Sequence, residues 1–357
     1  MTFEIPTKII FGEGSFSKIS EIISKDENFL LICGAHFLET KEFSFLKKNF
    51  PQMEILSGVK PEPKLNEIEI YWNKVKGKKP RSILAIGGGS VIDTAKVLAA
   101  KFTNKKENFR DFFGKEKIKK KCLKLIAIPT TSGSGSEVTK YSVIKDSGIK
   151  KVIISEKIYP EIAIVDPMLT LSTSKELTAY AGLDALSHNL ESYMSKKANL
   201  FSEIYSIEGV RLCLKWLEKA YENGNNIEAR RGMSLASLFG GIAITNAPTG
   251  IVHLLSKILD SFVEIPHGLG NAIFLPYAIK YCNSEKLQKL ERELKIENLP
   301  EHLVKLNENL RIPRLGEFKI SQEDFIRKTK ENITLVVDPS STAIGDENLI
   351  NIILESM

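Results

Sequence analysis

The sequence predicts an α/β domain built on a parallel sheet over residues 1–170, followed by an all-helical domain over residues 171–357. Two observations support this fold class. In the first half, short apolar runs that end at glycine or turn residues alternate with helical patterns. From about Ser174 to Ile279, apolar residues recur mostly with the period of a helix. The boundary is therefore expected near residues 167–174, and 357 residues are enough for two cores.

Four apolar runs are expected to form strands of the sheet: Phe29–Cys33, Ser82–Ile86, Leu125–Ile128 and Ile162–Val165. Runs that are apolar throughout are typical of parallel strands with helices on both faces of the sheet. Sheets of this kind bind ligands at the carboxyl ends of their strands. In the second domain, helices are expected at Glu176–Ser195, Phe201–Tyr221, Ile227–Ile244 and Ile251–Phe262.

The composition, 43% hydrophobic and 26% charged, is that of a soluble globular protein. The net charge of +6 comes from 50 basic and 44 acidic side chains, and the one dense basic run is Lys115–Lys124. We expect this run to be a solvated loop, because no aromatic residues interleave it as in a nucleic-acid surface. The four cysteines are too far apart for a disulfide framework or a thiolate site, and no signal peptide or long apolar run is present. The sequence thus predicts a cytoplasmic protein without nucleic-acid or membrane partners.

Two strand-end loops indicate a nucleotide site. The glycine-rich turn Gly87–Ser90 follows a strand and opens a helix, so its backbone can approach a pyrophosphate at the helix N-terminus. A tight turn without a ligand is the alternative for this segment alone. The loop Pro129–Glu137 supplies five hydroxyls and two glycines where the next strand ends. A flexible linker is the alternative here, but linkers are rarely bounded by buried strands on both sides.

A group of histidines indicates a metal site in the second domain. The chain has five histidines, and Asp184 and His188 stand four residues apart on one face of an expected helix. His253 opens another helix, and His267 lies between a proline and a glycine. Imidazole nitrogens with one carboxylate oxygen suit Fe²⁺ or Zn²⁺ rather than Ca²⁺ or Mg²⁺. Taken singly, a histidine is more often a structural residue than a ligand: His267 could cap a turn, and the Asp184–His188 pair could be a surface hydrogen bond.

Several long motifs in order resemble the iron-containing alcohol dehydrogenase family, also called group III. The motifs are FEIPTKIIFGEG (3–14), GGGSVIDTAK (87–96), PTTSGSGSEVT (129–139), IVDPMLT (164–170), AGLDALSHNLESY (181–193), GIVH (250–253) and PHGLGNAIFLPY (266–277). The resemblance implies a dehydroquinate synthase-like fold, with an NAD(P)-binding domain and a helical metal-binding, catalytic domain. The family's four metal ligands match Asp184, His188, His253 and His267. Its cofactor contacts match a set in the first domain: Gly88, Gly89, Ser90, Asp93, Thr130, Thr131, Ser134, Lys150 and Leu169.

The activity that the resemblance implies is that of an NAD(P)-dependent alcohol dehydrogenase and aldehyde reductase. In this reaction a metal-bound alkoxide gives a hydride to nicotinamide C4. The resemblance favours Fe²⁺, although Zn²⁺ is chemically as suitable, and it implies a homodimer. The alternatives are a relative that acts like dehydroquinate synthase or a glycerol or glycerol-phosphate dehydrogenase, or a cofactor-binding sensor without turnover.

Four features depart from the family pattern. Lys257 stands where the family often has a second histidine, so it either attracts an anionic substrate or faces solvent. Gly34 follows a strand at a position where members that prefer NAD often carry an acid, which favours NADP because a 2′-phosphate is not repelled. Glu62 replaces a common asparagine, and the region after Tyr281 is shorter than usual.

Overall fold

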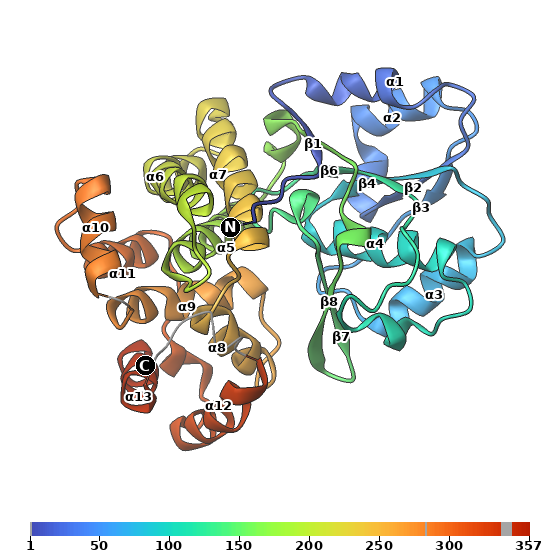
Figure 1. The fold of residues 1–357 in the computed structure, drawn as a ribbon. Coiled ribbons are helices and arrows are strands. Elements are labelled where there is room, and N and C mark those ends of the chain that lie inside the picture. The colour runs from blue at the N-terminus through green and yellow to red at the C-terminus, as the bar shows by residue number, and fades with distance from the viewer. Residues whose placement is uncertain (1, 283, 337–344) are drawn as a thin grey trace. The chain divides into compact units, whose positions relative to one another are not determined.

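In the computed structural model of the chain, residues 2–282, 284–336 and 345–357 are described, and they group into two units (Figure 1). The sheet unit comprises Ile5–Thr131 and Gly135–Leu171. The helical unit comprises Ser172–Met357, the short segment Ser132–Ser134 and the N-terminal stretch that ends at Glu4.

A six-stranded parallel sheet organises the described part of the sheet unit. Its strands are β1 (Lys8–Phe11), β2 (Phe29–Cys33), β3 (Glu54–Leu56), β4 (Ser82–Gly87), β6 (Lys124–Pro129) and β9 (Ile162–Val165). They lie in the order β1-β9-β6-β4-β2-β3. The four expected strands are confirmed as β2, β4, β6 and β9. Strands β2 and β9 begin and end at the expected residues, and β4 and β6 are longer by one or two residues. From β2 the chain moves outward to β3 and then returns to β4 on the other side, so the direction of winding changes between β2 and β4.

Helices cover both faces of this sheet (Figure 1). Short α1 (Ile19–Ile22) and α2 (Lys41–Asn49) share a core with Leu31 and Cys33 of β2, whereas α3 (Leu65–Val75) and α4 (Gly89–Thr103) share another core with Leu30 and Ile32. Since successive side chains of a strand point to opposite faces, both sides of β2 must be apolar. This arrangement explains the continuous apolar runs in the sequence.

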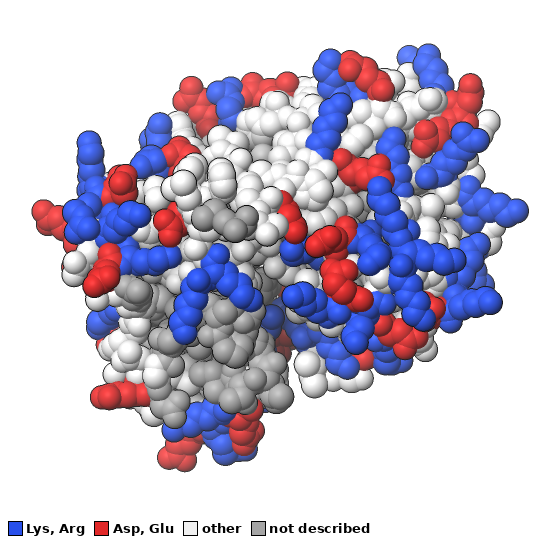
Figure 2. Space-filling view, in the orientation of Figure 1, with Lys and Arg blue, Asp and Glu red and all other residues white. Residues whose placement is uncertain are grey.

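A smaller sheet joins β5 (Gly114–Lys115), β8 (Ile149–Ile154) and β7 (Tyr141–Asp146), of which β7 and β8 form an antiparallel hairpin. The basic run Lys115–Lys124 begins at the last residue of β5 and ends at the first residue of β6. Two of its lysines, Lys119 and Lys121, form ion pairs with Glu107 and Glu161. On the face drawn in Figure 2, Lys and Arg side chains stand among Asp and Glu side chains.

The helical unit packs around one hydrophobic core. Its helices are α5 (Lys175–Met194), α6 (Leu200–Glu222), α7 (Ile227–Asn246), α8 (Ile251–Asp260), α9 (His267–Lys280), α10 (Ser284–Leu294), α11 (Leu299–Asn309), α12 (Gln322–Val336) and α13 (Asp346–Ser356). The four expected helices are confirmed to within two residues at each end. Among the described helices, none alone is long and apolar enough to cross a membrane, although α7 and α8 meet that test jointly as a bent pair.

The segment Ser132–Ser134 groups with the helical unit because of close packing. A Cβ at Gly133 would lie 2.8 Å from the carbonyl oxygen of Ala181 on α5, so only glycine allows this approach. The hydroxyls of Ser132 and Ser234 lie 3.1 Å apart. The sequence-based boundaries, by contrast, assign this segment to the first domain.

Candidate metal centre and cofactor loops

Helix α5 supplies two of the four expected metal ligands. Ser174 caps the helix by accepting a hydrogen bond from the backbone N–H of Leu177. From there the helix runs buried through the core, and it carries Asp184 and His188 one turn apart on the same face. The Nε2 atom of His188 lies 3.6 Å from Oδ1 of Asp184. Both side chains are buried.

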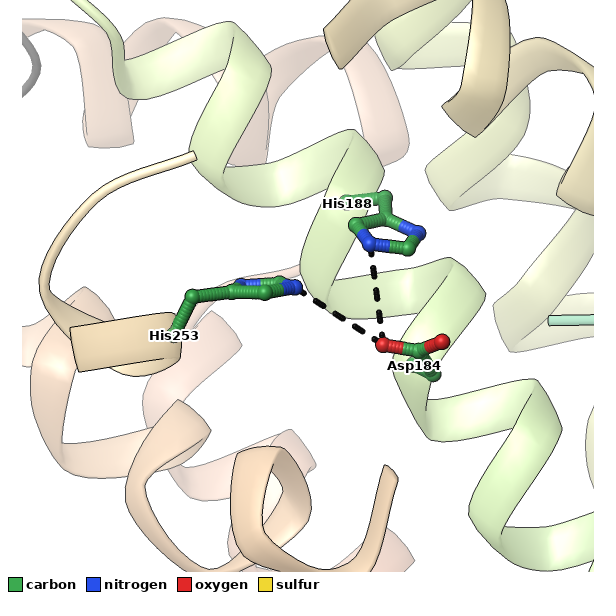
Figure 3. Close-up of side chains that lie close together, drawn as sticks. All are labelled: Asp184, His188 and His253. Carbon is green, nitrogen blue, oxygen red and sulfur yellow. Dashed lines mark ion pairs between the residues drawn. The ribbon is translucent and has the colours of Figure 1, made fainter. Parts of the chain in front are cut away.

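The other two histidines approach the same carboxylate oxygen from α8 and α9. His253 Nε2 lies 3.7 Å from Asp184 Oδ1, and His267 Nε2 lies 3.9 Å from it. Figure 3 shows His188 and His253 converging on Asp184 from two separate helices. The ligand atoms of Asp184, His188 and His253 all lie within 4.8 Å of one another. One carboxylate oxygen therefore faces three imidazole nitrogens.

Glycine at position 268 allows α9 to come this close to α5. A Cβ on Gly268 would lie 2.1 Å from the carbonyl oxygen of Tyr180 and 3.3 Å from the Cβ of Asp184. His267, the residue before it and the first of α9, is thereby held beside Asp184. In the Pro-His-Gly sequence, the histidine thus supplies a potential metal ligand and the glycine allows the helix to approach α5.

The donor set fits a four-coordinate divalent ion. Ligands of such an ion, bonded at about 2.0–2.2 Å, stand about 3.4 Å from one another, close to the 3.6, 3.7 and 3.9 Å observed here. Burial lowers the pKa of His188, against the opposing effect of the Asp184 carboxylate. A neutral imidazole is the form that binds metal, so the buried environment favours the required protonation state.

Two residues that the sequence did not single out complete the site. Glu191 pairs its carboxylate with Nδ1 of His253, the nitrogen that faces away from Asp184. The amide Nδ2 of fully buried Asn271 lies 2.8 Å from Asp184 Oδ1 and 3.2 Å from His253 Nε2. Glu191 stands seven residues after Asp184 on the same helix face, and this spacing was the available signal for it.

The expected cofactor loops lie at the change of winding in the sheet unit. Gly34 directly follows β2, and Gly88 directly follows the neighbouring β4. Helix α4 begins at Gly89, and its N-cap residue, Gly88, makes no side-chain capping hydrogen bond, so this helix N-terminus is suited to binding an anion. A Cβ on Gly88 would lie 3.1 Å from the hydroxyl oxygen of Thr131. Glycine at position 88 therefore leaves space between the end of β4 and Thr131.

The remaining expected cofactor residues take different positions. Asp93 has both carboxylate oxygens engaged, by the Ser136 hydroxyl at 2.6 Å and the Val143 N–H at 2.8 Å, and burial raises its pKa. It therefore ties the hydroxyl-rich loop and β7 to α4.

Ser90 accepts a hydrogen bond from the Glu62 N–H, and the Glu62 carboxylate lies 2.7 Å from the Nζ of Lys150. Glu62 and Lys150 thus form an ion pair beside the start of α4. The Thr130 N–H donates to the Gly87 carbonyl.

Two other expected cofactor residues have different neighbours. Leu169 packs against the core that α1 and α2 share with the sheet, and Ser134 groups with the helical unit. Lys257 lies one turn after His253 on α8 and is partly buried.

A parallel-sheet unit with a glycine-rich turn at the start of a helix, together with a helical unit that carries a cluster of potential metal ligands, is typical of nicotinamide-dependent oxidoreductases that use a metal ion. Comparison with known proteins narrows this class. A family model described as iron-containing alcohol dehydrogenase matches residues 6–167, and the model of that family's C-terminal region matches residues 178–331. The chain therefore belongs to the iron-containing alcohol dehydrogenase family, and it is an oxidoreductase that acts on alcohols.

Individual relatives are similar to this chain over nearly its whole length. An alcohol dehydrogenase of Thermococcus barophilus is 35% identical and aligns with 92% of this chain and 90% of its own. An NADPH-dependent butanol dehydrogenase of Clostridium saccharobutylicum is 31% identical over 97% of this chain and 92% of its own. The structure of an iron-containing alcohol dehydrogenase from Thermococcus thioreducens is 32% identical, covers 99% of both chains and superposes with a TM-score of 0.87.

Proposed function

We propose that this chain oxidises alcohols and reduces aldehydes with NAD(P) and one divalent metal ion held by Asp184, His188, His253 and His267. The observation that carries the proposal is the approach of three imidazole Nε2 atoms to one carboxylate oxygen, at 3.6 to 3.9 Å. When bound there, the ion supplies Lewis-acid chemistry that lowers the pKa of a substrate hydroxyl and polarises a carbonyl in reverse.

Side chains in and around this centre favour metal binding through their charge, protonation state and hydrogen bonds. Asp184 supplies a negative charge, and burial keeps His188 neutral and able to offer its lone pair. Asn271 donates its amide hydrogen to Asp184 and so holds the carboxylate in place. The low exposure of Asp184, His188 and His253 keeps bulk water from competing for the donor atoms.

The two parts of the chain divide the work in this proposal. Residues 1–170 bind the nicotinamide cofactor, with its pyrophosphate at the start of α4, and residues 171–357 bind the metal and the substrate. Gly34 favours NADP, because it places no carboxylate at the end of β2 where a 2′-phosphate would be repelled.

The proposal extends to the ion, the substrate, the location and the assembly of the chain. Fe²⁺ is preferred because of the family, while Zn²⁺ suits the same donors. Lys257, on the helix that carries His253, favours a substrate with a negative charge. The four free cysteines support a reducing, cytoplasmic location. A homodimer is proposed from the family alone.

The direct test is NAD(P)H oxidation with a panel of neutral and anionic aldehydes after anaerobic loading with Fe²⁺ or Zn²⁺. We expect turnover that depends on the ion, and His253→Ala should lose both bound metal and turnover. His302→Ala is the matched control, because His302 lies on α11 outside the candidate centre. No turnover with any metal and cofactor, or full metal content in His253→Ala, would refute the proposal.

A further inference from the structure

One buried carboxylate connects the His253 ring to the start of the helix that carries it. Glu191 lies on α5 and is 5% exposed. Its Oε1 accepts hydrogen bonds from the backbone N–H groups of Gly250, at 2.9 Å, and Val252, at 2.8 Å. Its Oε2 contacts Nδ1 of His253. Both oxygens are therefore engaged at the N-terminus of α8.

This geometry decides which ring nitrogen of His253 carries the proton. Oε1 of Glu191 already accepts two N–H groups, and when Oε2 accepts as well, Nδ1 of His253 is the donor. In a neutral imidazole the proton on Nδ1 leaves a free lone pair on Nε2. The amide Nδ2 of Asn271, a donor, lies 3.2 Å from that Nε2 and thus requires the same tautomer. Two independent partners therefore agree on the assignment.

The same carboxylate completes the end of α8. Gly250, the N-cap of this helix, has no side chain that could accept a hydrogen bond. Glu191 provides the missing acceptor from another helix, and its negative charge is favourable at a helix N-terminus. Ring orientation and helix position are consequently fixed by one group.

We propose that Glu191 is a positioning residue that holds His253 as the Nδ1–H tautomer, with Nε2 aimed at Asp184 for metal binding. The inference rests on the proposed metal centre. It adds that affinity for the ion depends on a residue that does not touch it. Outer partners of this kind usually change metal affinity by about 10- to 100-fold.

Glu191→Gln separates this role from simple packing, because the two side chains have nearly the same shape. With the amide oxygen on the backbone N–H groups, the amide NH₂ faces Nδ1, and the proton must move to Nε2. With the amide reversed, the NH₂ group faces two backbone donors. Both orientations oppose the required arrangement. Glu176→Gln is the matched control, since Glu176 is an exposed carboxylate at the start of the same helix.

The experiment measures the affinity of the full chain for Zn²⁺ by competition with a chelator, and the absorption spectrum of its Co²⁺ form. We expect Glu191→Gln to bind Zn²⁺ about 10- to 100-fold more weakly and to shift the Co²⁺ bands, while Glu176→Gln matches the wild type. Wild-type affinity and spectrum in Glu191→Gln would overturn the inference.

A second measurement reads the tautomer in the wild-type chain itself. Long-range ¹H–¹⁵N spectra of the Zn²⁺-loaded wild type, labelled on histidine, report the tautomer of each ring, and His253→Ala assigns the signal. An Nδ1–H signal supports the role of Glu191, and an Nε2–H signal overturns it. A wild-type chain that binds neither Zn²⁺ nor Co²⁺ would instead overturn the proposed metal centre itself.

Discussion

Replacing Gly268 with alanine should displace the helix that carries His267 and weaken metal binding. The new Cβ would stand 2.1 Å from the carbonyl oxygen of Tyr180, which belongs to the backbone of α5. Non-bonded atoms rest at about 3.5 Å, so α9 and α5 must separate locally by about 1.4 Å. The Tyr180 oxygen is a backbone atom, and the next side chain in contact, Asp184, is met at its Cβ, so a rotamer change cannot relieve the strain.

A shift of this size is large for a metal ligand. His267 Nε2 already lies 3.9 Å from Asp184 Oδ1, and metal sites tolerate only about 0.2 Å in ligand distance. We expect at least about a 10-fold loss of Zn²⁺ affinity, since even the loss of an outer partner costs about 10- to 100-fold. Overpacking should also lower the free energy of unfolding by about 1–3 kcal/mol.

Chelator competition with Zn²⁺ and urea denaturation measure the two effects on Gly268→Ala. Gly77→Ala is the control, because a Cβ there meets no described atom within 4 Å. If Gly268→Ala binds Zn²⁺ as tightly as the wild type and the control, the close approach of α9 to α5 does not hold His267 in place, and the reasoning is refuted.

Three further changes test the sheet unit. Gly34→Asp should shift the ratio of NADPH to NADH affinity by about 10-fold towards NADH, or about 1.4 kcal/mol. The site has room for the new side chain, because a Cβ there meets only one backbone oxygen, at 3.8 Å. An unchanged affinity ratio in fluorescence titrations would contradict this prediction. Burial raises the pKa of Glu137 from 4.5 to about 7, so the folded chain binds this proton more tightly and stability falls as the pH rises between these values. Glu137→Gln should lack this decline, of up to about 3 kcal/mol, and equal pH slopes in urea denaturation would count against it. Asp93→Ala removes the acceptor for Ser136 and should lower the free energy of unfolding by about 1–3 kcal/mol; calorimetry that finds no change would argue against this role.

Local patterns predicted those parts of the molecule whose cause is local. The strands β2 and β9 begin and end at the expected residues, because each is a continuous apolar run bounded by residues that favour turns. The pairing of Asp184 with His188 also follows from the period of one helix. These features require no knowledge of how distant segments pack.

The rest of the site depends on contacts between segments far apart in the chain. His267 reaches Asp184 because α9 packs against α5, and His253 reaches it from α8, which packs against α9; spacing in the sequence cannot show this. Glu191 was visible on the same helix face, but carboxylates are common on helices and its partner Nδ1 lies on α8. Asn271 carries no charge and looks like an ordinary buried polar residue until its amide is seen beside Asp184.

The excursion of Ser132–Ser134 into the helical unit has a consequence for dissecting this enzyme into fragments. A fragment that begins at residue 171 would lack Gly133, which packs against Ala181, and the partner of Ser234. It would also lack Glu4, whose N–H donates to Asn246 at 2.7 Å. Because the chain enters the helical unit at three places, a single cut cannot yield both units whole. Each unit therefore contains segments that the ribosome synthesises at different times, and it cannot be complete until the last of them has been made.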